Sequence, residues 1–125
     1  MCNCKTKDLS QNIGTWQSLY VRLPSFMRSS HKNTFIWIDK CLTKEIKYLW
    51  SKGVVTTGCC CGHNFKCPYI GVDSESSERM KELGYKVQYN PFNPNHDTEF
   101  YPKSVKVRLK FRVNNYLMKL FRIKK

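Results

Sequence analysis

Two early segments of the chain have the hydrophobic pattern of β-strands. In the segment 15–24, the apolar residues Leu19, Val21 and Leu23 occupy every second position. The segment 34–38, TFIWI, combines β-branched and aromatic residues, which strands favour. Because side chains alternate between the two faces of a strand, both segments are predicted to be strands.

The next segment has the period of an α-helix, with apolar residues at i, i+4, i+7 and i+8. These residues are Leu42, Ile46, Leu49 and Trp50. Asp39 precedes the pattern and suits a helix N-cap. Gly53 suits the left-handed residue that follows a last helical turn. A helix with one buried side is therefore predicted between them.

After this helix the chain alternates between short strands and a second helix. Strands are predicted over 54–57 (VVTT), 68–72 (PYIGV) and 85–89 (YKVQY). A helix is predicted over 75–83, where acidic residues occupy the first turn. The stretch 90–102 is rich in turn residues and predicts a loop.

The basic C-terminal segment, 103–125, begins with alternating apolar and basic residues. The apolar positions are Val105, Val107, Leu109, Phe111 and Val113, and the cations between them are Lys106, Arg108, Lys110 and Arg112. This alternation predicts a strand over 105–113 with one apolar and one cationic face. Residues 116–125 predict a short amphipathic helix or a return strand.

Together these elements predict an α+β fold. A chain of 125 residues with 41% hydrophobic residues allows a single domain, 1–125, with one modest core. We expect one mostly antiparallel sheet of five or six strands, with two helices packed on one face.

Composition adds a cellular setting. No apolar run approaches the ~20 residues that span a bilayer, and the N-terminal MCNCKTKDLSQN lacks the apolar stretch of a signal peptide. We therefore expect a cytoplasmic protein with no membrane partner. Thiols stay reduced in the cytoplasm, and seven cysteines cannot all pair within one chain.

Positive charge is concentrated near the C-terminus. The chain has 22 lysines and arginines against 9 acidic residues, which gives a net charge of +13. Nine of the basic residues and none of the acidic ones lie in 103–125. We expect an anionic partner, such as a nucleotide or a nucleic acid. A solvated basic tail is the alternative.

The segment TTGCCCGHNFKC, residues 56–67, contains four cysteines and supports three interpretations. The first is a zinc site. Zinc takes thiolate and imidazole ligands, usually arranged as two separate C-x₂₋₄-C pairs, and no second pair of this kind is present. No metal or other cofactor is therefore expected. If zinc is bound, its ligands are predicted to be Cys59, Cys61, His63 and Cys67.

The second interpretation is a small enzyme with a cysteine nucleophile, Cys59, Cys60 or Cys61, beside His63. A reactive cysteine needs a lowered pKa, commonly from a histidine or a helix N-terminus. The element that follows this segment is predicted to be a strand, which supplies no helix dipole, so catalysis is not expected.

The third interpretation, which we favour, is an anion site made by the backbone. Gly58 and Gly62 bracket the cysteines and permit positive φ angles, which point successive N–H groups into one concavity. The predicted ligand-binding residues of this segment are Thr57, Gly58, Cys59, Cys60, Cys61, Gly62, His63, Asn64 and Lys66. The cations Lys106, Arg108, Lys110 and Arg112 are predicted to contribute from the C-terminal strand.

The run IDKCLTKEIKYLWSKGVVTTGCCCGH, followed by YIGVDSES and MKELGYK, resembles a group of small uncharacterised proteins of phages and prophages of low-GC bacteria. The resemblance covers residues 36–86 and centres on the motif GCCCGH. The run TTGCCCGH is also faintly similar to the wybutosine-synthesis methyltransferases that act on transfer RNA. His63 stands where that family has arginine, and the chain lacks a cofactor-binding half, so methyl transfer is not expected.

The resemblance to phage proteins implies a role in countering host defence, where antiviral systems signal with nucleotides. We therefore expect a non-catalytic, homo-oligomeric binder of an anionic nucleotide, a sponge for an immune signal in the cytoplasm of the infected cell. Aromatic residues near the basic segments, Tyr69, Tyr85, Tyr89, Phe92, Phe100 and Tyr101, could stack on a base. The alternative functions are a basic RNA- or DNA-binding protein, with or without zinc, and the cysteine enzyme described above.

Overall fold

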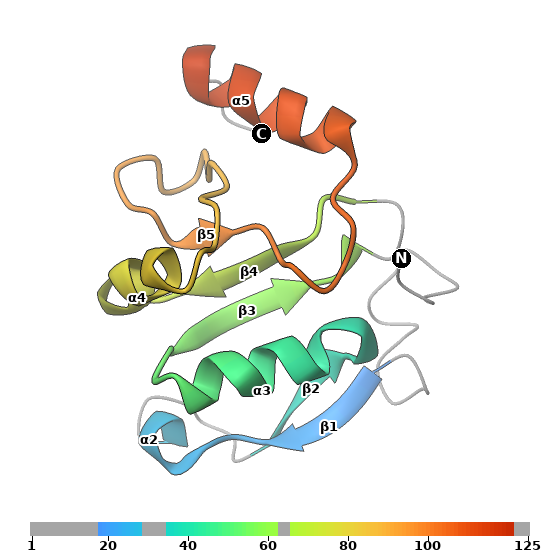
Figure 1. Ribbon diagram of the computed structural model, residues 1–125, viewed down its shortest axis with the longest axis vertical. Helices are drawn as coiled ribbons and strands as arrows, with labels where there is room; N and C mark the ends of the chain where they lie inside the picture. The colour runs from blue at the N-terminus through green and yellow to red at the C-terminus, as the bar shows by residue number, and fades with distance from the viewer. Residues whose placement is uncertain (1–17, 29–34, 63–65, 122–125) are drawn as a thin grey trace.

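The computed structural model describes residues 18–28, 35–62 and 66–121 (Figure 1). In these ranges the chain forms an α+β fold with four α-helices and two small antiparallel sheets. The α+β class is confirmed. The prediction of a single sheet of five or six strands is wrong, because one sheet has two strands and the other has three.

The first sheet pairs β1 (Ser18–Arg22) with β2 (Phe35–Asp39). Ser18 lies opposite Asp39 and Arg22 opposite Phe35, so both predicted N-terminal strands are confirmed within these bounds. The inner face of this sheet carries Val21 and Ile38, which are buried. A short helix, α2 (Ser25–Arg28), follows β1.

The predicted first helix is also confirmed. A 3-10 turn, η1 (Lys40–Leu42), leads into α3 (Thr43–Ser51), and α3 crosses the molecule between the two sheets (Figure 1). All the apolar residues predicted for its buried side are buried. Gly53 has a φ of 81° and ends the helix as expected. Asp39 makes no side-chain cap here, because its carboxylate binds elsewhere.

The second sheet has the strand order β3-β4-β5, with β3 (Thr56–Cys60), β4 (Tyr69–Val72) and β5 (Glu99–Phe100). Between β4 and β5 the chain forms η3 (Ser74–Ser76) and α4 (Ser77–Glu82). The predicted second helix is confirmed, and Asp73 caps the 3-10 turn that leads into it, because its Oδ1 accepts from the Ser76 N–H at 2.9 Å. The predicted strand 85–89 is reduced to one bridge, between Val87 and Phe100.

The two sheets are separate because β2 and β3 are not hydrogen-bonded as strands. A cavity of about 270 Å³ lies between them, lined by residues 36–38 of β2, 56–59 of β3 and Ile46 of α3. Beyond this cavity, a side-chain bond joins the end of β2 to the residue after β3: the Cys61 N–H donates to Asp39 Oδ2 at 2.9 Å. The prediction of two helices packed on one face of a single sheet is also wrong. The helices lie at several positions around the two sheets (Figure 1).

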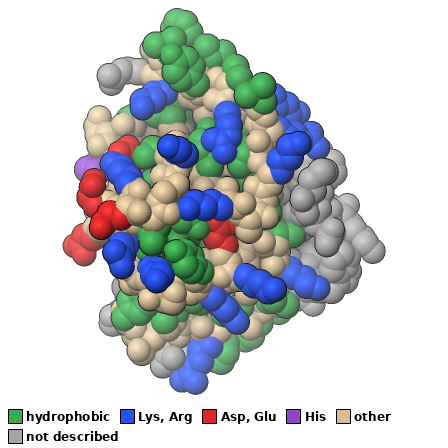
Figure 2. Space-filling model, viewed as in Figure 1, with side chains coloured by type: hydrophobic (Ala, Val, Ile, Leu, Met, Phe, Trp, Pro, Cys, Tyr) green, Lys and Arg blue, Asp and Glu red, His purple; other side chains and the backbone are tan. Residues whose placement is uncertain are grey.

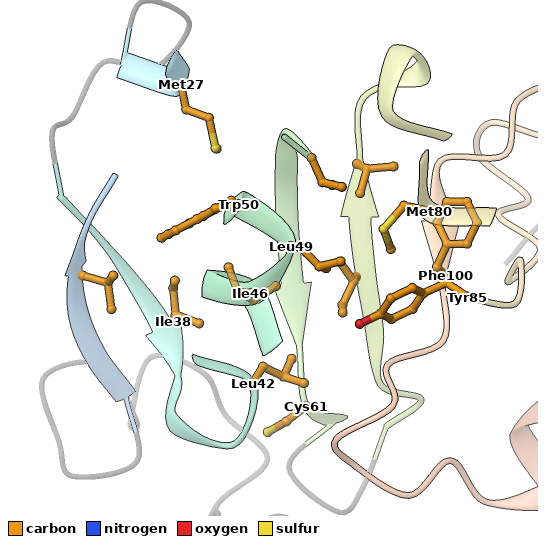
Figure 3. Close-up of a cluster of buried hydrophobic side chains, with 14 of the residues drawn as sticks. Met27, Ile38, Leu42, Ile46, Leu49, Trp50, Cys61, Met80, Tyr85 and Phe100 are labelled. Carbon is orange, nitrogen blue, oxygen red and sulfur yellow. The ribbon is translucent and has the colours of Figure 1, made fainter. Parts of the chain in front are cut away.

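The hydrophobic core extends across both sheets (Figure 3). On one side β2, η1 and α3 contribute Ile38, Leu42, Ile46, Leu49 and Trp50, and on the other side lie Met80, Tyr85 and Phe100. The Trp50 indole N–H donates to Thr56 Oγ1 at 2.9 Å, so the one polar atom of this ring is satisfied in the core.

The predicted strand over 105–113 is wrong. Residues Leu109–Phe121 form a helix, α5, which lies above the second sheet (Figure 1). A helix turns about 200° for every two residues, so alternating apolar positions fall on its opposite sides. In α5, one side of the helix is buried and carries Asn115 and Met118. The opposite side is exposed and carries Leu109, Val113 and Leu120. For 116–125 either a short helix or a return strand was predicted, and residues 116–121 are helical, as the continuation of α5.

The predicted row of cations is therefore wrong as well. Lys106 and Arg108 precede α5, whereas Lys110 and Arg112 lie within it. Two residues apart on a helix, Lys110 and Arg112 project in nearly opposite directions. These cations cannot follow the phosphates of a nucleic-acid strand as a straight row.

Candidate functional site

The cysteine segment is mostly strand. Cys59 and Cys60 belong to β3, and of the two glycines that bracket the cysteines only Gly62 has a positive φ, 78°. Gly58 pairs with Gly71 in the sheet. The geometry predicted for an anion site, a concavity between two left-handed glycines, is therefore wrong.

Two N–H groups of this segment, those of Cys61 and Gly62, have acceptors inside the protein. The Cys61 N–H donates to Asp39 Oδ2 at 2.9 Å, and Asp39 is only 4% exposed. The Gly62 N–H donates to Cys60 Sγ at 3.3 Å. These two N–H groups are thus already bonded within the protein, and the ligand-binding role predicted for the other described residues of the segment stays a prediction. His63 and Asn64 lie outside the described residues, and a ligand-binding role for Lys66, which is exposed, stays a prediction.

Gly62 nevertheless has a clear structural role, and we expect Gly62→Ala to lower the free energy of unfolding by about 1–3 kcal/mol. Its positive φ disfavours any Cβ, and an added Cβ would approach Pro68 N at 3.2 Å and Pro68 Cδ at 3.3 Å. Gly53→Ala is the matched control, since Gly53 has a φ of 81° and no atom within 4 Å of the added Cβ. Urea denaturation of both variants should show the larger loss for Gly62→Ala. Equal losses would contradict a tight turn at Pro68.

The cysteines themselves are poorly placed for catalysis or for zinc. Burial raises the pKa of the Cys59 thiol to about 12, and the Asp39 carboxylate adds to this effect, so the thiol stays protonated at neutral pH. Cys61 is buried in the core, and Cys67 contacts Asn115 and Gln88 instead. Within the described ranges, no three side chains of the types that bind metals are grouped closely enough to hold an ion.

A larger pocket lies between α5 and the chain that precedes it. It encloses about 380 Å³, within the range of small-molecule sites. Its lining consists of three tyrosines, three cations, an asparagine and a valine, namely Tyr89, Tyr101, Tyr116, Lys86, Arg112, Lys119, Asn115 and Val87. No acidic residue lines it, so its surroundings favour an anion.

Hydrogen bonds fix the inner wall of this pocket. The Asn115 amide donates to Tyr101 Oη at 3.1 Å and to Cys67 Sγ at 3.6 Å. Asn115 is 4% exposed, and its Oδ1 accepts no hydrogen bond from the described residues. A buried acceptor without a donor is costly. A ligand N–H would satisfy it.

Aromatic and cationic groups form the rest of the wall. The Arg112 guanidinium lies 4.2 Å above the ring of Tyr101, a distance typical of a cation–π contact. Burial raises the pKa of the Tyr101 phenol, which keeps it a neutral hydrogen-bond donor. Lys86 and Lys119 are exposed and form no ion pair with a described acidic residue.

A smaller hollow of about 70 Å³ adjoins the pocket and shares Val87, Tyr89 and Lys119 with it. Asp97 lines this hollow, but its carboxylate binds Lys81 Nζ at 2.8 Å. His96 lines it too. The two spaces together form one groove that begins at α5 and continues along the segment 87–97.

The fold holds both sides of the groove in place. The Tyr101 N–H donates to the Lys86 carbonyl at 3.0 Å, and the Gln88 N–H donates to the Glu99 carbonyl at 2.8 Å. The Gln88 side chain donates to the Pro68 carbonyl at 2.9 Å. Backbone pairing therefore fixes Lys86 and Tyr101 as neighbours, and α5 closes the pocket from above.

The surface around the molecule is divided by charge (Figure 2). Lys and Arg side chains are spread over the face seen there, whereas acidic side chains gather mainly at one edge, over α4, with a further one near the centre of the face. Hydrophobic side chains gather over α5. An anionic ligand would meet mostly positive charge on this face.

The structure brings together only part of the predicted site. Arg112 lines the pocket and Cys67 lies behind its wall, whereas Lys106, Arg108 and Lys110 do not line it. Thr57, Gly58 and Cys59 line the separate cavity beside β2. Sequence reasoning missed Asn115 and Lys119, because only the helical assignment of α5 places them on the side that faces Lys86.

No family model, curated protein or solved structure matches the chain. None of the helices in the described ranges has the length and apolar character to cross a membrane. The functional conclusion therefore depends on the geometry of the pocket.

Proposed function

We propose that the protein is a non-catalytic binder of a small anionic ligand of the nucleotide type, held in the pocket between α5 and the segment 86–101. The observation that carries this proposal is the lining of the pocket, which combines three cations and three tyrosines with no acidic residue. Phosphate groups attract lysine and arginine, and the flat rings of bases stack on aromatic side chains.

Each part of the lining has a role in this proposal. Lys86, Arg112 and Lys119 contact the phosphate oxygens. Tyr89 and Tyr116 offer ring surface to the base, while Tyr101 is held in place by Asn115 and Arg112. The unused Oδ1 of Asn115 accepts a hydrogen bond from an N–H of the base edge. We propose this site in place of the one predicted at residues 57–66, where the Cys61 and Gly62 N–H groups already donate within the protein.

In a phage, such a protein would act by sequestering a nucleotide signal of the host. A sponge needs affinity and no turnover. The protonated thiol of Cys59 and the dispersal of Cys61 and Cys67 agree with binding without catalysis. Homo-oligomerisation stays a prediction.

The test is a thermal-shift screen with cyclic dinucleotides, ADP-ribose and mononucleotides. A ligand at a hundredfold excess over its Kd should raise the free energy of unfolding by about 2.7 kcal/mol. The double variant Lys86→Ala/Lys119→Ala should weaken binding roughly tenfold or more, because it removes two charge-assisted hydrogen bonds. Lys44→Ala/Lys47→Ala makes the same charge change on the exposed side of α3 and should leave the shift intact.

Recovery of the ligand distinguishes binding from catalysis. A sponge returns the ligand unchanged after the protein is denatured, whereas an enzyme returns a product. The proposal would be overturned if no ligand of the panel shifted the melting temperature, or if both double variants lost the shift equally.

A further inference from the structure

A second unused surface lies on the outer face of the β1–β2 sheet. Tyr20, Phe35 and Trp37 are 59%, 39% and 44% exposed, although they are large apolar residues. Tyr20 lies opposite Trp37, and Arg22 lies opposite Phe35. Because side chains alternate along a strand, these four side chains share one face. We call this face the aromatic platform.

Tyr20 contacts both of the other rings of the aromatic platform. The ring centroids of Tyr20 and Phe35 are 5.1 Å apart with an interplanar angle of 20°, and those of Tyr20 and Trp37 are 4.8 Å apart with an angle of 38°. Such distances are typical of aromatic pairs. The three rings thus form one row across two strands, with Tyr20 in the middle and Phe35 and Trp37 at its ends.

The core does not account for the platform. The sheet buries its other face, which carries Val21 and Ile38 against α3. Burying large aromatic rings stabilises a folded monomer. Adjoining aromatic residues that stay exposed commonly mark a binding surface.

We propose that the aromatic platform binds single-stranded nucleic acid by base stacking. Every base has a π face, so a row of aromatic rings beside positive charge holds a single strand with little sequence preference. Bases within a duplex are already stacked and paired, so a duplex does not fit this mode.

Charge favours a nucleic acid over a second copy of this chain as the occupant. Arg22 belongs to the platform, and Asp39 is the only acidic residue of β1, α2 and β2. The Asp39 carboxylate is buried and bonded to the Cys61 N–H. A second copy would bring another net charge of +13, which repels the first, whereas a phosphate backbone is attracted.

Trp37 also lines the cavity between the sheets, together with Thr57 and Gly58. A ligand-binding role for Thr57, Gly58 and Cys59 stays a prediction.

The experiment measures the fluorescence anisotropy of a labelled 12-nucleotide oligo(U) on titration with the protein at low salt. Trp37→Ala and Tyr20→Ala should each weaken binding roughly 5- to 150-fold, the range found for loss of one stacking ring. Both side chains are exposed, so the fold should persist, which circular dichroism checks. Tyr48→Ala is the matched control, because Tyr48 is 45% exposed on α3, and it should bind like the wild type.

Other outcomes would overturn the proposal. These are no binding of oligo(U), equal affinity for a duplex, or unchanged affinity in Trp37→Ala. A dimer that Trp37→Ala converts to a monomer without a change in affinity would assign the platform to self-association instead. Lys86→Ala/Lys119→Ala should retain most of the oligo(U) affinity, which separates this site from the pocket under α5.

Discussion

Glu45→Ala is expected to lower the free energy of unfolding by about 3–5 kcal/mol, the loss typical of breaking a buried charged network. Glu45 is 8% exposed. Its carboxylate accepts from the Lys103 N–H at 2.8 Å, the Ser104 N–H at 2.9 Å and the Tyr85 hydroxyl at 2.6 Å. Removal of the carboxylate leaves these donors without their acceptor in a partly buried position, and each such loss costs about 1–3 kcal/mol.

The change should also reach the ligand pocket. Lys103 and Ser104 lie in the segment between Tyr101 and α5. Glu45 therefore fixes the segment that leads into α5, and α5 forms the upper wall of the pocket. Glu45→Gln should lower the free energy of unfolding nearly as much. The NH2 group of the glutamine side chain would face hydrogen-bond donors where the carboxylate had an acceptor oxygen. Glu78→Ala is the control, since the Glu78 side chain is 82% exposed, and it should change stability by under about 0.5 kcal/mol. Urea denaturation measures all three variants, and a loss for Glu45→Ala as small as that of the control would contradict the network.

The Tyr85 phenol keeps its proton over the ordinary pH range and so remains a hydrogen-bond donor to Glu45. Burial, and then the hydrogen bond to Glu45, raise the pKa of the Tyr85 phenol well above its usual value. A raised pKa means that the contribution to stability is complete below pH 10 and is lost only as the pH rises further. The anchor of the pocket is therefore intact at neutral pH.

Local patterns predicted the N-terminal half of the fold well. The alternation in 18–22 and the helical period in α3 each describe one buried face of a single element, which is information that neighbouring residues carry. The positive φ at Gly53 and Gly84 was likewise foreseeable from the helices that these glycines end.

The separation of the sheets could not be predicted in this way. It depends on whether β2 pairs with β3, and the contacts seen there, Ile46 at the cavity and the bond from Cys61 to Asp39 across 22 positions of the chain, join residues that no local pattern relates. Asp39 shows the same limit, because its sequence context suggested a helix cap and its carboxylate instead accepts an N–H of the cysteine segment.

α5 was mistaken for a strand because its two apolar sides produce the same alternation as one face of a strand. Leucine, lysine and arginine, which are frequent in this segment, are good helix formers, and this was the available signal. Because of this error the site was predicted in another part of the fold. Arg112, Asn115 and Lys119 lie beside the tyrosines only when this segment is a helix. The tyrosines and the cations were each recognisable as candidates, but their meeting at one pocket is a tertiary property.

Phe100→Ala is expected to lower the free energy of unfolding by about 3–5 kcal/mol, as for other fully buried phenylalanines. Phe100 is 0% exposed, and it lies against Met80 and Tyr85 in the core (Figure 3). Its backbone pairs with Ile70 of β4 and bridges to Val87. The alanine variant leaves a cavity at the point where the second sheet meets the segment that lines the pocket.

Phe92→Ala is the matched control for this change, because the same atoms are removed from a side chain that is 71% exposed. It should alter stability by no more than about 0.5 kcal/mol. Phe100→Leu should fall between the two, since leucine refills part of the space. If Phe100→Ala and Phe92→Ala unfolded at the same urea concentration, β5 would not be a core strand. The segment 86–101 would then lack the support that holds Lys86 and Tyr101 beside α5, and the ligand pocket would lose its inner wall.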